Sequence, residues 1–285
     1  MANEALHLNA GTAPRQVSLG VKRMNNVNEL TEQQAKGLAA GPYGKQVSKF
    51  PLLFAKAAFF GQRPSPKRAT KIRNGSISLV EIGNRSYGIT CHHVVEEYRL
   101  YREQHDDVIF NIGHVELDPV NQLVDTDQKI DIALIELTND QIIQLTSEGE
   151  IGSQVYKPAK WPPNQPQKDE FVIFGGFPGS FRVVESFNEI VFYSWSSGGS
   201  RIDAGGGTRF ISAFERDHWI SSFGEKHNLE LKDLGGMSGG PAFIKREFHF
   251  EFVGILTDYE KNYDTVFFAS AQTIKENGQI TKAPF

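Results

Sequence analysis

The chain has 285 residues, of which 39% are hydrophobic and 22% charged, and its formal net charge is -4. This length is sufficient to bury a substantial core, and the composition is typical of a globular protein rather than a disordered one. A slightly acidic chain argues against a nucleic-acid partner, because phosphate binding depends on clustered Lys and Arg. No apolar stretch approaches the length of a membrane-spanning helix, so no membrane insertion is expected.

The cysteine content indicates a reducing compartment. Cys91 is the only cysteine, so no intrachain disulfide can form and the fold must depend on packing. The first residues, MANEALHLNAGTAPRQ, lack the basic start and apolar run of a secretory signal. Together these features predict a cytoplasmic location.

Residues 1–45 are polar and are interpreted as an N-terminal extension, through which a regulatory partner could bind. One helix is predicted here, from Asn28 to Ala40, ending before Gly41-Pro42. Further helices are predicted over Val94–Gln104, in a short piece after Thr138-Asn139-Asp140, and over Asp217–His227.

Short β-type runs dominate the rest of the chain, and Gly83-Asn84 between two of them is typical of a hairpin turn. Repeated short strands separated by turn residues indicate barrels or a sandwich. The predicted strands are Ser76–Ile82, Arg85–Thr90, Val108–Leu117, Ile130–Leu137, Glu170–Phe174, Glu189–Trp195, Pro241–Phe250, Glu251–Leu256 and Thr265–Ser270.

A proline-rich segment divides this strand-rich region into two parts. The sequence KPAKWPPNQPQ, residues 157–167, cannot donate a regular ladder of hydrogen bonds. We therefore expect a first β-barrel over residues 46–156, a linker over residues 157–168 and a second β-barrel over residues 169–285.

Ser238 lies in a glycine-rich segment, GGMSGGP, that could turn sharply and direct successive N–H groups toward one point. An ordinary turn with a solvated serine is the alternative interpretation. A nucleophile elbow is a second alternative, but there a helix follows the serine, and the acid and the histidine come later in that order. Here the following sequence is β-like, and its only histidine, His249, precedes Asp258 and Asp264.

His92 and His93 lie where a predicted strand runs into a predicted helix. A histidine held by backbone on both sides has the fixed orientation that a general base needs. Two ordinary surface or core histidines are the alternative. A metal site formed with Cys91 is less favoured, because neighbouring residues of a strand point to opposite faces and no second ligand cluster is evident.

Asp131 opens an apolar strand, IDIALIEL. A carboxylate among so many hydrophobic residues is costly unless it is hydrogen-bonded, and a histidine would satisfy it. An ordinary aspartate at the start of a strand remains the alternative.

Taken together, these segments resemble the trypsin-like serine proteases. TCHHVV is similar to the histidine motif of the bacterial high-temperature-requirement branch, and the alignment selects His93 over His92. IDIALIEL and GGMSGGPAF resemble the aspartate and serine motifs, in the family's order of His, Asp and Ser. Residues 175–179 and 253–257 are similar to an early turn of the second barrel and to the strand lining the substrate groove; the resemblance covers about residues 70–275.

The resemblance implies a chymotrypsin-like, all-β fold of two packed six-stranded antiparallel barrels, with few short helices and the N-terminal extension. It implies a serine endopeptidase acting on protein or peptide substrates, with Ser238 as nucleophile, His93 as general base and Asp131 orienting the histidine. The N–H groups of Gly236 and Ser238 would hold the oxyanion. No cofactor and no metal are implied, and the residues expected at the substrate are Lys232, Asp233, Thr257 and Thr265.

One departure from the family bears on activation. Position 237 is Met, where the digestive enzymes have an aspartate that accepts a newly formed N-terminus. Two other functions remain open: a protease-fold binding or sensing module with latent or lost catalysis, and an ester hydrolase.

Overall fold

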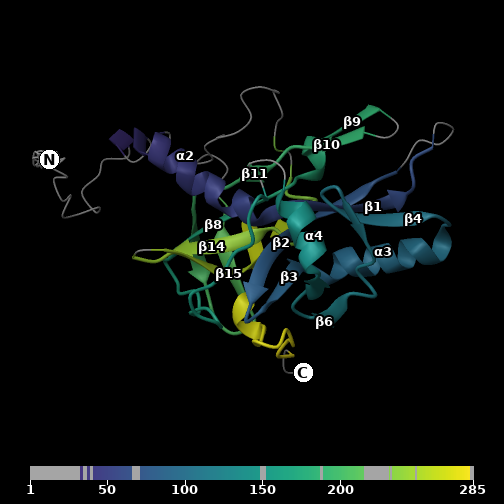
Figure 1. The fold of residues 1–285 in the computed structure, drawn as a ribbon. Helices are drawn as coiled ribbons and strands as arrows, with labels where there is room; N and C mark the ends of the chain where they lie inside the picture. The colour runs from purple at the N-terminus through teal and green to yellow at the C-terminus, as the bar shows by residue number, and fades with distance from the viewer. Residues whose placement is uncertain are drawn as a thin grey trace, which may run out of the picture.

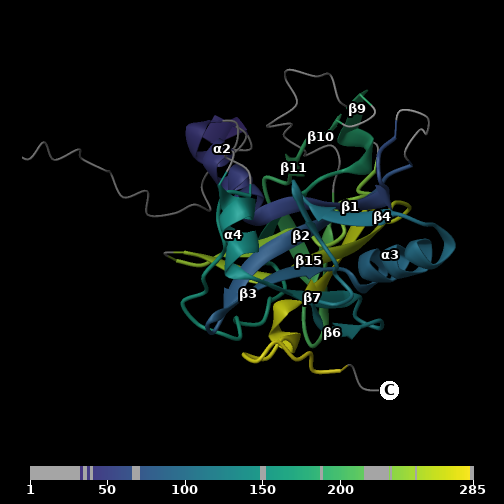
Figure 2. The same cartoon turned by 45° about the vertical axis from the view of Figure 1, so that its right-hand side comes forward.

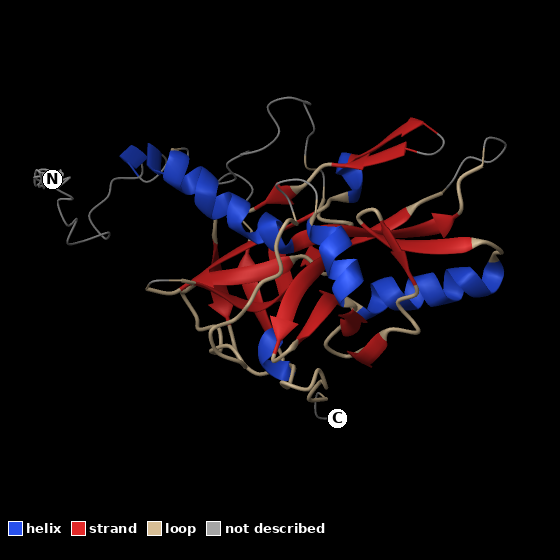
Figure 3. Ribbon diagram, viewed as in Figure 1, coloured by secondary structure: helices blue, strands red, loops and turns tan. Residues whose placement is uncertain are grey.

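A computed structural model describes residues 33–34, 37–38, 41–65, 71–147, 152–186, 189–214, 231, 233–247 and 249–282 of the chain. Figure 1 shows a body of β-strands with helices at its periphery, and Figure 3 separates the two by colour. The predicted helix over Asp217–His227 and most of the one over Asn28–Ala40 lie outside the described residues.

The first sheet has seven antiparallel strands among the described residues, in the order β5-β4-β1-β2-β3-β7-β6. Gly83, with φ of +63°, forms the predicted tight turn between β2 and β3. The strands are β1 (Ala55–Gln62), β2 (Arg73–Ile82), β3 (Arg85–Thr90), β4 (Val108–Ile112), β5 (Val115–Leu117), β6 (Leu123–Asp127) and β7 (Ile132–Leu137).

The second sheet closes into a ring. Its order is β11-β8-β12-β13-β16-β15-β14, and a further pairing of β8 with β14 joins six of these strands into a barrel, with β11 added beside β8. The strands are β8 (Phe171–Gly176), β11 (Trp195–Ser196), β12 (Ser200–Ala204), β13 (Arg209–Ala213), β14 (Pro241–Lys245), β15 (Phe250–Glu260) and β16 (Thr265–Ser270). A separate hairpin of β9 (Arg182–Ser186) and β10 (Glu189–Phe192) projects from the body (Figure 1).

Short helices cover the sheets. Helix α3 (His92–Gln104) packs against β4 and β7, near the two ends of the first sheet, and α4 (Asn139–Thr146) starts with a capping box at Thr138. In Figure 2, α3 lies at one side of the strands and α2 and α4 at the other. The remaining helices are α2 (Pro42–Lys49) and the short 3-10 helices η2 (Phe50–Phe54), η3 (Gly179–Phe181) and η5 (Ala271–Thr273).

Two large hydrophobic clusters fill the molecule. The first lies in the first sheet and includes Phe60 and Phe110, but Phe243 and Phe252 of the second sheet also belong to it. The second cluster lies inside the closed barrel, and Met237 is fully buried within it. Because the first cluster includes residues of both sheets, the sheets pack directly against one another.

The predicted all-β class, with two sheets and few short helices, is confirmed. The six-stranded barrel is formed by the second sheet, whereas the pairings of the described residues leave the first sheet open. The predicted strand Val108–Leu117 is a hairpin, because Gly113 takes a φ of +55° and turns β4 into β5. Helix α2 begins at Pro42, where the missing N–H of a proline costs nothing. The predicted end of the preceding helix, at Ala40, lies outside the described residues.

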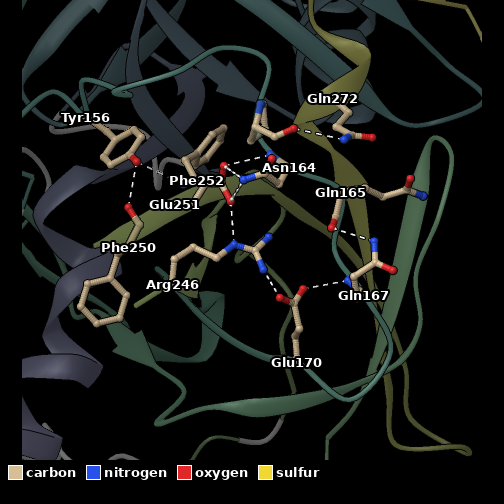
Figure 4. A network of polar contacts seen from close by, with 11 residues as sticks. Tyr156, Asn164, Gln165, Gln167, Glu170, Arg246, Phe250, Glu251, Phe252 and Gln272 are labelled. Carbon is tan, nitrogen blue, oxygen red and sulfur yellow. Dashed lines mark hydrogen bonds and ion pairs between the residues drawn. The ribbon is translucent and has the colours of Figure 1, made fainter. Parts of the chain in front are cut away.

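Asn164 attaches the segment 157–168 to a partly buried network of ion pairs in the second sheet (Figure 4). Arg246 donates to Glu251 at 2.7 Å and also pairs with Glu170. Glu251 is 6% exposed, and it accepts hydrogen bonds from the backbone and side-chain amides of Asn164 at 2.8 and 3.1 Å. Buried charges are stable only when paired and hydrogen-bonded in this way. The network therefore holds the proline-rich segment against the turn between β14 and β15.

No helix in the described part of the chain is both long enough and apolar enough to cross a membrane.

Candidate active site

His93 is oriented by the junction between β3 and α3. Cys91 is extended, with φ of -75° and ψ of 146°, and His93 is the second residue of the helix. Its Nδ1 lies 2.8 Å from Oδ2 of Asp131. His92 instead places its Nδ1 2.9 Å from Oγ1 of Thr126. The two neighbouring histidines therefore have different partners, and only His93 contacts the aspartate.

Asp131 holds His93 at two points. Its Oδ1 accepts a hydrogen bond of 3.0 Å from the His93 backbone N–H, while its Oδ2 meets the imidazole. Asp131 has a φ of +61°, a left-handed conformation that Asp tolerates better than most residues. Burial favours a raised pKa for Asp131, but the hydrogen bonds from His93 outweigh it and lower the pKa below the usual value of 3.8. The aspartate is therefore ionised at neutral pH.

The imidazole of His93 is accessible to solvent, since its side chain is 43% exposed, against 17% for Asp131. Burial tends to lower the pKa of His93, but its hydrogen bond to Asp131 and the surrounding negative charges raise the pKa above 6.5. Asp131 also selects the tautomer in which Nδ1 carries the proton, so Nε2 of the neutral ring is left as an acceptor.

Ser238 lies in two consecutive tight turns. Met237 N donates to Leu234 O at 2.9 Å, and Gly240 N donates to Met237 O at 2.8 Å. Gly236 and Gly239, the third residues of these turns, have φ of +90° and +93°. A positive φ at the third position is typical of a type II turn and requires glycine. The glycines that flank Ser238 in sequence are thus needed for its backbone path.

The N–H groups of residues 235–240 divide into two sets. Four donate to protein acceptors: Gly235 to Asp233 Oδ1, Met237 to Leu234 O, Gly239 to Leu256 O and Gly240 to Met237 O. Among the residues that the structure describes, the N–H groups of Gly236 and Ser238 meet no acceptor. Both residues are partly exposed, so these two donors are open to an acceptor from outside the protein. These two are the pair that the sequence assigned to the oxyanion.

A pocket of about 360 Å³ brings the three predicted residues together. The Ser238 hydroxyl donates to Thr257 O at 3.3 Å, and no hydrogen bond joins it to His93 in the described structure. The residues lining the pocket are His93, Asp131, Arg209, Ser238, Thr257, Asp258 and Phe267.

The predicted substrate residues are placed differently. Thr257 lines the pocket. Asp233 is exposed and accepts from Gly235 N, while Thr265 lies in β16 and donates to Tyr263 O at 3.0 Å; neither lines the pocket. Lys232 lies outside the described residues.

Sequence reasoning missed Arg209, Asp258 and Phe267. Asp258 directly follows Thr257, so the prediction that Thr257 lies at the substrate could have been extended to it. Arg209 and Phe267 carry no local signal, because they reach the pocket through the pairing of β13 with β16.

Cys91 completes a cluster with His93 and Asp131, whose possible ligand atoms all lie within 4.8 Å of one another. Burial raises the pKa of the Cys91 thiol well above its usual value, and its Sγ donates to Leu256 O at 3.3 Å. A metal binds the thiolate rather than the thiol, so this environment disfavours coordination. His92 faces Thr126 and is outside the cluster.

No family model and no curated protein matches the sequence. Solved structures with a similar arrangement include a catalytically active tobacco etch virus protease complexed with product, at 13% identity and a TM-score of 0.43, with 85% of this chain and 81% of that chain covered. A thermostable serine protease from an extremophilic microorganism is 15% identical, with a TM-score of 0.41, 77% of this chain covered and 91% of that chain covered. An M. tuberculosis protease in its active form is 12% identical, with a TM-score of 0.40, 81% of this chain covered and 82% of that chain covered. Similarities at these scores carry no argument about the site, whose assignment depends on the geometry described above.

Proposed function

We propose that this chain is a serine endopeptidase that forms an acyl-enzyme on Ser238. The observation that carries this proposal is the meeting of His93, Asp131 and Ser238 in one pocket, together with two N–H groups of the Ser238 loop that meet no acceptor among the described residues. These are the parts that acyl transfer needs: a nucleophile, an oriented base and donors for a developing oxyanion.

In the proposed reaction, Ser238 Oγ attacks the peptide carbonyl carbon while its proton passes to Nε2 of His93. The negative charge on the carbonyl oxygen is held by the N–H groups of Gly236 and Ser238. The imidazolium is stabilised by Asp131 and returns the proton to the amine as the C–N bond breaks. Water, deprotonated by the same histidine, then hydrolyses the acyl ester and restores Ser238.

Serine is the proposed nucleophile because of the position of the only thiol. Cys91 is fully buried and is the only cysteine of the chain, whereas Ser238 is partly exposed and lines the pocket. No cofactor is needed for this chemistry.

The remaining parts of the proposal rest on the sequence. We propose residues 46–156 and 169–285 as two β-domains joined by residues 157–168, and residues 1–45 as an extension that can bind a regulatory partner. TCHHVV supports a nearest relationship to the bacterial high-temperature-requirement branch, and the single cysteine supports a cytoplasmic location. Lys232, Asp233, Thr257 and Thr265 are the proposed substrate residues.

One observation favours the second function, a binding module with latent catalysis. Ser238 Oγ donates to Thr257 O rather than to His93. A rotation about the serine Cα–Cβ bond would redirect the hydroxyl, and hydrogen bonds at such sites often tighten only when substrate binds.

Labelling separates the two functions. The full chain is treated with a fluorophosphonate, the modified residue is located by peptide mass spectrometry, and a peptide library and an ester substrate are digested in parallel. A peptidase is modified at Ser238 and cleaves library peptides. A protein that is neither labelled nor active is a binding module, and one that hydrolyses esters but no peptide is an esterase.

A further inference from the structure

We propose that Ser76, on β2 of the first sheet, is a positioning residue that holds the oxyanion hole in its active arrangement. This inference rests on the proposed function, because it concerns the same loop, residues 235–240. Nothing in the sequence pattern of Ser76 marks it for this role.

All six carbonyl groups of the loop accept hydrogen bonds, and the donors come mostly from other segments. Ser76 and Ser78 of β2 supply three of them, Gly179 one, Leu256 one, and only Gly240 lies within the loop. The first sheet thus contributes half of the donors that hold a loop of the second.

Ser76 contacts the loop through both its hydroxyl and its backbone N–H. Its hydroxyl is fully buried, donates to Gly236 O at 2.9 Å and accepts from Phe177 N at 2.9 Å. Its backbone N–H donates to Ser238 O at 2.8 Å. A buried hydroxyl with both a donor and an acceptor partner has one fixed orientation. Ser76 therefore links the loop to the turn at Phe177.

The same turn holds the other side of Gly236. Gly179 N donates to Gly235 O at 2.6 Å, so the peptide groups before and after Gly236 are both held, the first by Gly179 and the second by Ser76. Fixing both peptide planes fixes φ and ψ of Gly236, here at a φ of +90°. Rotation of the first peptide group would redirect the Gly236 N–H and break the bond from Gly179.

Residue 237 explains why such support is needed. In the digestive relatives a carboxylate at this place binds a new N-terminus and orders the loop, but here Met237 is fully buried in the apolar cluster of the barrel. A thioether there offers no charge to pair with an ammonium. Ser76 and the turn at Phe177–Gly179 supply a different and permanent means of ordering.

The test compares Ser76→Ala with Ser78→Ala in the full chain. Both serines are fully buried on β2 and donate to a carbonyl of the loop, but Ser78 contacts Gly239 O, which does not adjoin Gly236. The measurement is the rate constant for fluorophosphonate labelling of Ser238 as a function of pH. Ser238 Oγ forms a bond to phosphorus as fluoride leaves, and the phosphoryl oxygen carries negative charge in the pentacoordinate transition state, so the rate reports the oxyanion donors.

We expect Ser76→Ala to lower the high-pH plateau of the labelling rate by about 10- to 100-fold, because a slightly displaced donor loses much of its effect. The pH midpoint should stay that of the wild type, since His93 and Asp131 are not touched. Ser78→Ala should lower the plateau by no more than about threefold. Equal plateaus for the two variants, or a shifted midpoint in Ser76→Ala, would overturn the assignment.

A second pair of variants covers the case in which Ser76→Ala does not fold. Gly179→Pro removes the N–H that holds Gly235 O, and Pro178 already has the extended conformation that a following proline requires, with φ of -57° and ψ of 137°. Gly179→Ala keeps the N–H, and its new Cβ would meet only ordinary contacts of 3.4 Å. We expect Gly179→Pro to lower the plateau of the labelling rate at least 10-fold and Gly179→Ala to leave it near that of the wild type. Loss in both variants, or in neither, contradicts the proposal.

Failure of the proposed function gives a different result. If the wild-type chain is not labelled at Ser238, the peptidase proposal fails. If the wild type is labelled and Ser76→Ala is labelled equally fast, only the role of Ser76 fails.

Discussion

The His93–Asp131 pair and the loop around Ser238 are assembled in different ways. The pair joins helix α3, which follows β3, to the turn before β7, over 38 residues and through bonds of 2.8 and 3.0 Å. Half of the donors that hold the loop come from the opposite sheet, and the Ser76 to Gly236 bond spans 160 residues. The pair is therefore a property of one sheet, whereas the loop exists only when the two sheets are packed together. Weakening that packing should disorder the loop before it disorders the pair.

The largest expected effect comes from Ser238→Ala. This change should lower peptide hydrolysis by about 10⁶-fold, because the nucleophile is lost. The fold should be retained, since among the described residues the hydroxyl makes one bond of 3.3 Å, to Thr257 O. Hydrolysis of a library peptide and the melting temperature are measured together. Substantial remaining turnover would remove Ser238 from its role and with it the functional meaning of the loop.

The pair is tested by the two neighbouring histidines. His93→Ala should lower hydrolysis by about 10⁵-fold or more, because the base is lost. His92→Ala removes only the contact with Thr126 and should retain most of the activity. Initial rates on the same peptide decide between them. The reverse ranking would assign the base to His92 and contradict the geometry of the pair.

The pH dependence reports the charge on the pair. Neutral His93 accepts the serine proton, so activity should fall about tenfold for each pH unit below its pKa. Because the pKa of His93 is raised, the half-maximal rate should lie above pH 6.5. Asp258→Asn removes one of the charges that raise this pKa and should move the midpoint to lower pH. A rate that is flat from acid to neutral pH would exclude a histidine base.

The smallest expected effect on peptidase activity is that of proteolytic cleavage ahead of Ser76. The loop already has its turns and its donors, and Met237 offers no partner for a new ammonium group. Protein beginning at Met1 should therefore be active without a cut in residues 1–75. Intact mass and peptidase rate are followed together over time. Activity that appears only in step with such a cut would show that the loop is not ordered by the first sheet.

The sequence allowed prediction of the residues whose local setting is unusual. Asp131 opens an apolar run, His93 lies at the change from strand to helix, and Ser238 lies among glycines. The structure brings these three side chains to one pocket. Their catalytic roles and those of the Gly236 and Ser238 N–H groups stay predictions.

Other residues could not be found because their neighbours are set by strand pairing. Ser76 resembles any serine of a strand until β2 is placed against the loop, and Arg209 depends on the register of β13 against β16. Strand β1 was missed for a related reason. Its sequence AKAAFFGQ is buried on both faces and shows no alternation of polar and apolar residues.

The closure of the second sheet has a consequence for solubility. A sheet edge exposes unpaired N–H and C=O groups that can recruit strands from other copies of the chain. The pairing of β8 with β14 removes both edges of the six-stranded ring, including that of the apolar strand Pro241–Lys245. The first sheet ends instead at β5, which has three residues, and at β6, which carries Asp125 and Asp127. At β6, Ile280 N and Lys282 Nζ donate to Asp125, so the C-terminal segment contacts this edge. Very short edges and edges covered by another segment are poor templates for aggregation, so each sheet is protected in its own way.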